Sequence, residues 1–206
     1  RDIADAGRVQ FYRGEHRVAL RLLDAAREQG VNTGYIHERL RAIVGYEARF
    51  QKRDSEHFSI RFLDKDEIVA HYAVAVLEAA YQGVSEALEF YPAEDGEKIV
   101  VEIYPDARGL ASATGLKVSE IAASGTIAVC KYHRLMITSP LATANGYAWA
   151  DTLSHELVHL IISKKSHNRV PIWLHEGIAK FYESAWRGPL GDALGAYGEK
   201  LLAQGV

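Results

Sequence analysis

The run His-Glu-Leu-Val-His at residues 155–159 constrains this chain more than any other feature. Side chains four residues apart lie on one helix face, so His155 and His159 would present two imidazoles to one point, as a tetrahedral zinc ion requires. Glu156 lies about 100° around the helix, where it can accept a proton from a water at the metal. The surrounding segment 150–163 is apolar on nearly all sides, which predicts a buried helix. Because imidazoles are costly to bury without partners, the alternatives are a metal site and a pair of hydrogen-bonded core histidines.

A second stretch supplies the third ligand that such a site needs. Residues 170–179 read Val-Pro-Ile-Trp-Leu-His-Glu-Gly-Ile-Ala and begin another predicted helix. A catalytic zinc site takes three protein ligands and keeps one position open. His175 and Glu176 compete for the third position, and only one can reach the ion because helix neighbours point about 100° apart. We expect one Zn²⁺ per chain.

The two stretches together resemble the gluzincin metallopeptidases and their peptidase MA-like domains. The resemblance rests on the motifs at 155–159 and 173–179, the latter reading Trp-Leu-x-Glu-Gly-x-Ala, and extends weakly over residues 55–206. It implies zinc-dependent hydrolysis of peptide bonds, with the two histidines and Glu176 as ligands and Glu156 as general base. The gap between the motifs is shorter than in the best-known gluzincins, so we expect a tight intervening loop.

Residues around the ligands are expected to orient them. Glu183 lies seven residues after the glutamate ligand, on the same helix face, and matches the acid that orients a ligand histidine in aminopeptidase-like gluzincins. Thermolysin-like members instead place an Asp where this chain has Lys180, so the site resembles the aminopeptidase branch. Asp151, four residues before His155, is either the helix N-cap or an acceptor for an imidazole N–H.

The resemblance also implies groups that bind substrate. Gluzincins use a Tyr or His downstream of the third ligand to stabilise the oxyanion, and Tyr182 and Tyr197 are the candidates here. Only 30 residues follow Glu176, so we expect the donor and part of the substrate wall to be missing from this chain. An edge strand upstream of the metal helix aligns the substrate by backbone pairing; its counterpart here is Gly125, Thr126, Ile127 and Ala128, with an interior hairpin as the alternative. That strand carries no acidic motif for a substrate amine, which favours an endopeptidase over an aminopeptidase.

The remaining patterns predict an α+β fold, and the resemblance implies that it holds a gluzincin-like catalytic domain built from a small mixed sheet and the metal-binding helices. Alternating or continuously apolar runs predict strands, and a 3.6-residue apolar period predicts a long helix over 66–91. A short helix is expected over 106–115. The strands are expected at 57–62, 99–104, 123–130 and 134–138. The lone Cys130 excludes an intrachain disulfide framework.

Residues 1–53 predict a separate α-helical unit. Two helices joined at Gly14 resemble a tetratricopeptide repeat, because small or apolar residues stand where that repeat needs them. A third helix is expected over 35–51. A plain helical hairpin is the alternative. One repeat cannot bury its own faces, so it either docks on the catalytic domain or follows further repeats, and it offers a surface for a protein partner. The charged segment 51–56 predicts a turn and the boundary with a second domain at 55–206.

Composition narrows the classes of function. A formal net charge of −3 without a basic patch gives no reason to expect nucleic acid as a partner. No run of 18 apolar residues exists, so no membrane span is expected. The chain begins without Met, so we expect a trimmed or processed product, and a bacterial periplasmic or secreted location is implied only by the resemblance. The predicted function is a zinc peptidase acting on a peptide or protein; the alternatives are a catalytically idle zinc-binding scaffold and a helical-repeat protein-interaction module.

Overall fold

A five-stranded mixed sheet forms the centre of the computed structural model, which describes residues 2–93 and 96–187. The strand order is β1-β2-β3-β5-β4. The inner strands β2 (Phe58–Phe62), β3 (Ile99–Tyr104) and β5 (Arg134–Thr138) are parallel, whereas the edge strands β1 (Gln51–Asp54) and β4 (Ala128–Lys131) are antiparallel to their neighbours. The predicted α+β class with a small mixed sheet is confirmed.

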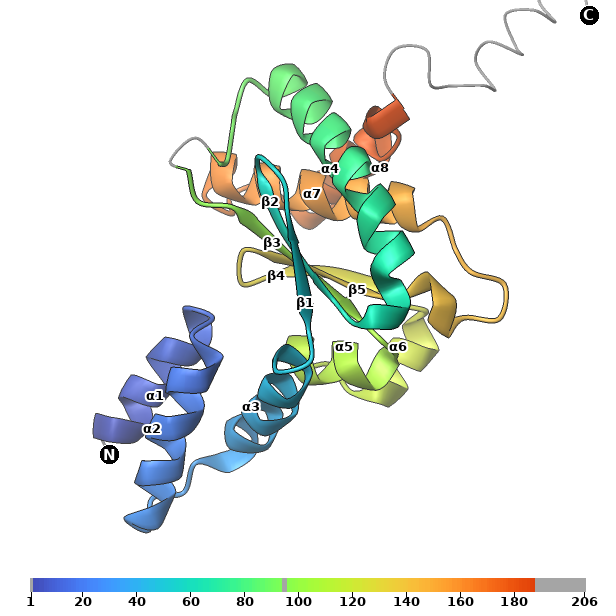
Figure 1. Ribbon diagram of the computed structural model, residues 1–206. Coiled ribbons are helices and arrows are strands. Elements are labelled where there is room, and N and C mark those ends of the chain that lie inside the picture. The colour runs from blue at the N-terminus through green and yellow to red at the C-terminus, as the bar shows by residue number, and fades with distance from the viewer. Residues whose placement is uncertain (1, 94–95, 188–206) are drawn as a thin grey trace, which may run out of the picture.

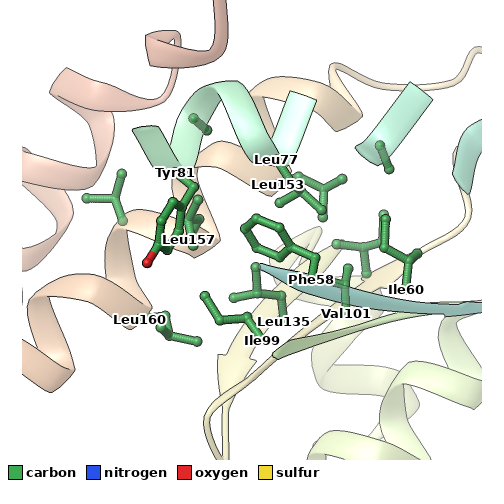
Figure 2. Packing of buried hydrophobic residues seen from close by; sticks show 14 of the residues in the cluster. Phe58, Ile60, Leu77, Tyr81, Ile99, Val101, Leu135, Leu153, Leu157 and Leu160 are labelled. Atoms are coloured by element: carbon green, nitrogen blue, oxygen red, sulfur yellow. The ribbon is translucent and has the colours of Figure 1, made fainter. Parts of the chain in front are cut away.

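Helices α4 (Glu67–Ala87) and α7 (Trp149–Ser166) cover one face of this sheet (Figure 1). Because successive strand residues point to opposite faces, Phe58 and Val101 both enter the buried cluster that also holds Leu157 of α7 (Figure 2). Each such side chain contributes roughly 1.5–3 kcal/mol when fully buried, so this layer fixes α7 firmly against the sheet. Neither α4, α7 nor any other described helix is long and apolar enough to cross a bilayer.

Shorter helices cover the opposite face. They are α5 (Ala107–Thr114) and α6 (Val118–Ser124). Asp106 begins α5 as its N-cap, accepting hydrogen bonds from two backbone N–H groups at 2.9 Å. Tyr104 and Met136 of the sheet are buried against these helices, so both faces of the sheet are packed.

Three helices precede the sheet, namely α1 (Asp2–Tyr12), α2 (His16–Glu28) and α3 (Gly34–Glu47). They have an apolar cluster of their own and lie on the α5 side of the sheet (Figure 1). Arg134 of β5 donates to the Gly14 carbonyl at 3.0 Å, between α1 and α2. Arg39 of α3 donates to two carbonyl groups in the last turn of α5 at 3.0 and 3.1 Å. The helical unit therefore docks on the sheet domain, as one of the two predicted arrangements requires.

The segment predicted as a charged turn between the domains is a strand instead. Gln51–Asp54 pairs with Phe62–Ser59 of β2 as the antiparallel edge strand β1. Its polar composition suits this position, because charged residues on an edge strand discourage pairing with other chains. The sheet thus begins at residue 51, before the predicted start of the second domain at 55.

Candidate metal centre

Helix α7 carries the two histidines of the His-Glu-x-x-His motif on a side that faces away from the core. Leu153, Leu157 and Ile161 of α7 are fully buried against the sheet and α4. His155 and His159, one turn apart, are only partly buried and point to the other side. The packing of the apolar face therefore fixes the direction in which both imidazoles point.

Three ligand atoms from two helices converge at this place. The Nε2 atoms of His155 and His159 lie 3.1 Å apart, and the Glu176 Oε2 atom of α8 (Ile172–Tyr182) lies 3.4 and 3.5 Å from them. Ligands about 2.0–2.1 Å from a tetrahedral zinc ion are separated by roughly 3.3–3.4 Å. The observed triangle has this size, so the three residues fit a zinc ion; they are the one such group among the described residues.

The protonation of His159 agrees with that fit. Burial, aided by the neighbouring imidazoles and opposed by the Glu176 carboxylate, lowers the pKa of His159 to about 4. A metal ligand must offer a neutral imidazole, and His159 is neutral at physiological pH. None of the described residues that line the cleft is a Lys or Arg, so no side-chain cation competes for the Glu176 carboxylate.

His175 does not join the ligand group but lies behind it. Its Nδ1 is 2.6 Å from Nδ1 of His159, the ring nitrogen that faces away from the ligand triangle. Its Nε2 lies 3.3 Å from the hydroxyl of Ser163. Of the two competing residues, Glu176 thus lies beside the two Nε2 atoms and His175 on the far side of one imidazole.

Glu156 lies next to the ligands in a buried environment. Its side chain is 9% exposed, and burial raises the pKa of its carboxyl to about 7. A hydrogen bond from the Cys130 backbone N–H opposes that rise, and the nearby Glu176 carboxylate adds to it. The bond to Cys130 anchors the carboxylate between α7 and the edge strand β4.

A cleft of about 480 Å³ opens over these groups. One wall is β4 and the other is formed by α7 and α8. Its lining residues are Ala128, Val129, Cys130, His155, Glu156, His159, Ser163, Ile172, His175 and Glu176. A larger hollow of about 710 Å³ lies beside Tyr46 and Lys65 on the α3 side, but no group of described metal-ligating residues lines it. The candidate metal-binding residues and the buried Glu156 therefore lie at the β4 cleft.

The predicted substrate strand begins later than expected. Residues 118–124 form α6, Gly125 is its left-handed C-cap with φ 68°, and β4 begins only at Ala128. Of Gly125, Thr126, Ile127 and Ala128, only Ala128 lines the cleft. The helix prevails because Glu120 closes a capping box with the Lys117 backbone N–H at 2.8 Å. The prediction of an edge strand in this region is nevertheless right, since β4 ends the sheet.

Asp151 has neither of its two predicted roles. Ala148 is the N-cap of α7, and Asp151 lies inside the first turn. Its carboxylate accepts hydrogen bonds from the Trp186 indole at 2.8 Å and from the Arg187 guanidinium at 2.7 and 2.8 Å. Both partners lie in the short helix η3 (Ala185–Arg187), so Asp151 ties the residues after α8 to the start of α7.

Glu183 lies where the sequence places it, close to a ligand histidine. Its Oε2 is 3.6 Å from Nδ1 of His155, and its Oε1 is 2.5 Å from the Lys180 ammonium group. The two histidines therefore face different partners at Nδ1, a carboxylate for His155 and an imidazole for His159. The sequence patterns did not predict His175 as the partner of His159 at Nδ1, nor Ser163 as the partner of His175. The available signal was that Ser163 lies four residues after His159 on the same helix face.

Of the two tyrosines predicted to stabilise an oxyanion, the one that the structure describes, Tyr182, does not line the cleft. Tyr182 ends α8 and packs on the main apolar core, with its ring edge-on to Phe181 at 4.9 Å. Its ring is therefore held by the apolar core and by Phe181. Tyr197 lies outside the described residues.

Comparisons with family models, curated proteins and solved structures returned no match to this chain. What the centre can do follows from its side chains: two imidazole nitrogens and a carboxylate oxygen at zinc-ligand separations, with the buried Glu156 carboxyl group alongside.

Proposed function

We propose that the chain is a zinc-dependent peptidase of the gluzincin type. The observation that carries this proposal is the triangle of 3.1, 3.4 and 3.5 Å formed by His155, His159 and Glu176. These three residues would hold the zinc ion. When bound, zinc supplies Lewis-acid chemistry, polarising a carbonyl group and making a water more acidic.

Glu156 supplies the proton transfer. Its carboxylate lines the same cleft as the ligands and is held by the Cys130 backbone N–H. In hydrolysis it accepts a proton from the attacking water and returns it to the nitrogen of the breaking peptide bond. The water oxygen thereby becomes part of the new carboxyl group, and the nitrogen leaves as an amine.

The substrate would bind along β4. This strand pairs with β5 on one side only, so its other edge can add an extended peptide through backbone hydrogen bonds. The described carboxylates lining the cleft are Glu156 and Glu176, which the chemistry already uses. With no further acid to bind a terminal amine, cleavage within a chain is favoured over removal of its first residue.

A catalytically idle zinc scaffold is the second candidate, and a specific observation supports it. The described lining of the cleft holds no Tyr, Asn, Gln or Arg to donate to an oxyanion, and its two other donors, Ser163 and His175, contact each other at 3.3 Å behind the His159 ring. Since removal of one such donor lowers kcat by about 10²–10³-fold, a centre without it would bind zinc but hydrolyse peptides poorly.

The substitution Glu156→Gln separates the two candidates. For a peptidase, hydrolysis of an internally quenched fluorogenic peptide falls by about 10²–10⁴-fold, while zinc bound per chain stays the same. The matched control Glu86→Gln, on the exposed side of α4, leaves both unchanged. A zinc-loaded wild-type chain that cleaves no member of a peptide library would support the scaffold, and retained hydrolysis in Glu156→Gln would refute the assigned mechanism.

A further inference from the structure

We infer that His175 is a positioning residue that holds His159 in the one tautomer able to bind metal. This inference rests on the proposed zinc centre and concerns the side of His159 that faces away from it. The Nδ1 atoms of His159 and His175 lie 2.6 Å apart. The ring centres are 4.8 Å apart with 21° between the planes. The two nitrogens thus lie between the ring centres, and the rings meet edge to edge, as a hydrogen bond in the ring plane requires.

The position of the protons follows from the ligand geometry. His159 turns Nε2 toward His155 and Glu176, at 3.1 and 3.5 Å. A neutral imidazole that offers the Nε2 lone pair to a metal carries its proton on Nδ1. That N–H points at His175, which must accept it at its own Nδ1.

The same reasoning fixes the tautomer of His175. With Nδ1 as acceptor, a neutral His175 carries its proton on Nε2, where the Ser163 hydroxyl oxygen lies 3.3 Å away. The order of donation is therefore His159 to His175 to Ser163. Ser163 and His159 lie four residues apart on one face of α7, so the helix itself spaces the two ends of this chain.

The two ligand histidines are consequently oriented by different chemistry. His155 faces the charged carboxylate of Glu183 at 3.6 Å, whereas His159 faces a neutral ring. Partners of metal-bound histidines commonly change metal affinity by about 10–100-fold when removed. Because the acceptor atom of His175 is Nδ1, the side-chain oxygen of Asn can occupy nearly the same position, whereas Leu has a similar size and no acceptor.

The test compares His175→Leu with His175→Asn in the full chain. Zinc dissociation constants are measured by competition with a fluorescent chelator, and thermal unfolding of the zinc-free proteins checks that both variants fold. We expect about 10–100-fold weaker binding for the Leu variant and wild-type binding within a few-fold for Asn. Equal affinities for Leu and wild type, or equal losses for Leu and Asn, would overturn the inference.

An NMR measurement distinguishes loss of the hydrogen bond to His175 from a simple change in packing. In zinc-loaded protein labelled with ¹⁵N-histidine, the Nδ1 proton of His159 should give a slowly exchanging signal in the wild type and in His175→Asn, and lose it in His175→Leu. The signal persisting in the Leu variant would refute the role of His175 while leaving the zinc centre intact. Failure of the wild-type chain to bind zinc would instead overturn the proposed centre itself, and this inference with it.

Discussion

Replacing Arg134 with Met should destabilise the protein by about 3–4 kcal/mol. The Arg134 guanidinium donates to Glu102 Oε1 at 3.0 Å and to the Gly14 carbonyl at 3.0 Å. Glu102 is 1% exposed, so loss of its partner leaves a buried carboxylate less compensated, a change that costs roughly 3–5 kcal/mol. The lower end applies because Arg61 at 3.2 Å and the Tyr104 hydroxyl at 2.9 Å remain. The orphaned Gly14 carbonyl adds about 1 kcal/mol.

The assay is urea unfolding followed by circular dichroism, with Arg61→Met as the matched control. Arg61 contacts the same Glu102 oxygen, but its side chain is 30% exposed, so its removal should cost about 1 kcal/mol. In a Glu102→Gln background the cost of Arg134→Met should shrink by about 2 kcal/mol, since no buried charge is then left behind. A cost below about 1 kcal/mol for Arg134→Met, or one that does not change in the Gln background, would refute the buried ion cluster and with it this account of how the helical unit is docked.

Two further predictions concern stability. Burial acts to raise the pKa of Glu78, but hydrogen bonds from the ring and backbone of His57 together lower it. An acid whose pKa is lowered by folding stabilises the protein above its unfolded pKa, about 4.3. Glu78→Gln should therefore cost about 1 kcal/mol at pH 7 and progressively less as the pH falls through the folded pKa, whereas Glu86→Gln should show no such trend in unfolding curves. Leu157→Ala, at a fully buried position of α7, should lower the free energy of unfolding by about 2–5 kcal/mol, and a loss below 1 kcal/mol would contradict the packing of that helix.

The parts of the fold that were predicted correctly depend on patterns within one element. The long helix expected over 66–91 is α4, and the strand expected over 99–104 is β3 with the same bounds. The helix has a 3.6-residue apolar period, and the strand is a short apolar run rich in β-branched residues, so each pattern can be recognised within its own segment. By contrast, β1 was predicted as a turn because its four polar residues have no period; it forms only through pairing with β2, a tertiary effect that local sequence does not encode.

In the candidate site, too, the residues placed correctly are those whose arrangement depends on a single helix. His155 and His159 lie together because both are on one helix, so their spacing alone predicts the arrangement. Asp151 has the same spacing from His155, but its carboxylate is held by Trp186 and Arg187. Those partners approach from another element, and the spacing rule carries no information about which outside group will reach a given side chain.

The placement of Glu176 depends on the connection between α7 and α8, which was predicted to be tight. That connection reverses the chain with His167 and Asn168 in the left-handed region, at φ 51° and 58°, and Pro171 then begins α8 as its N-cap. Two adjacent non-glycine residues at positive φ are each unfavourable by about 1–2 kcal/mol, although Asn is among the residues that tolerate this conformation best. The strain lies in the connection itself, between the end of α7 at Ser166 and the start of α8 at Ile172, and such strain persists only where the surrounding structure holds it. A short loop strained in this way leaves α8 little freedom to rotate, and this explains how Glu176 faces the two Nε2 atoms while its neighbour His175 faces the far side of His159.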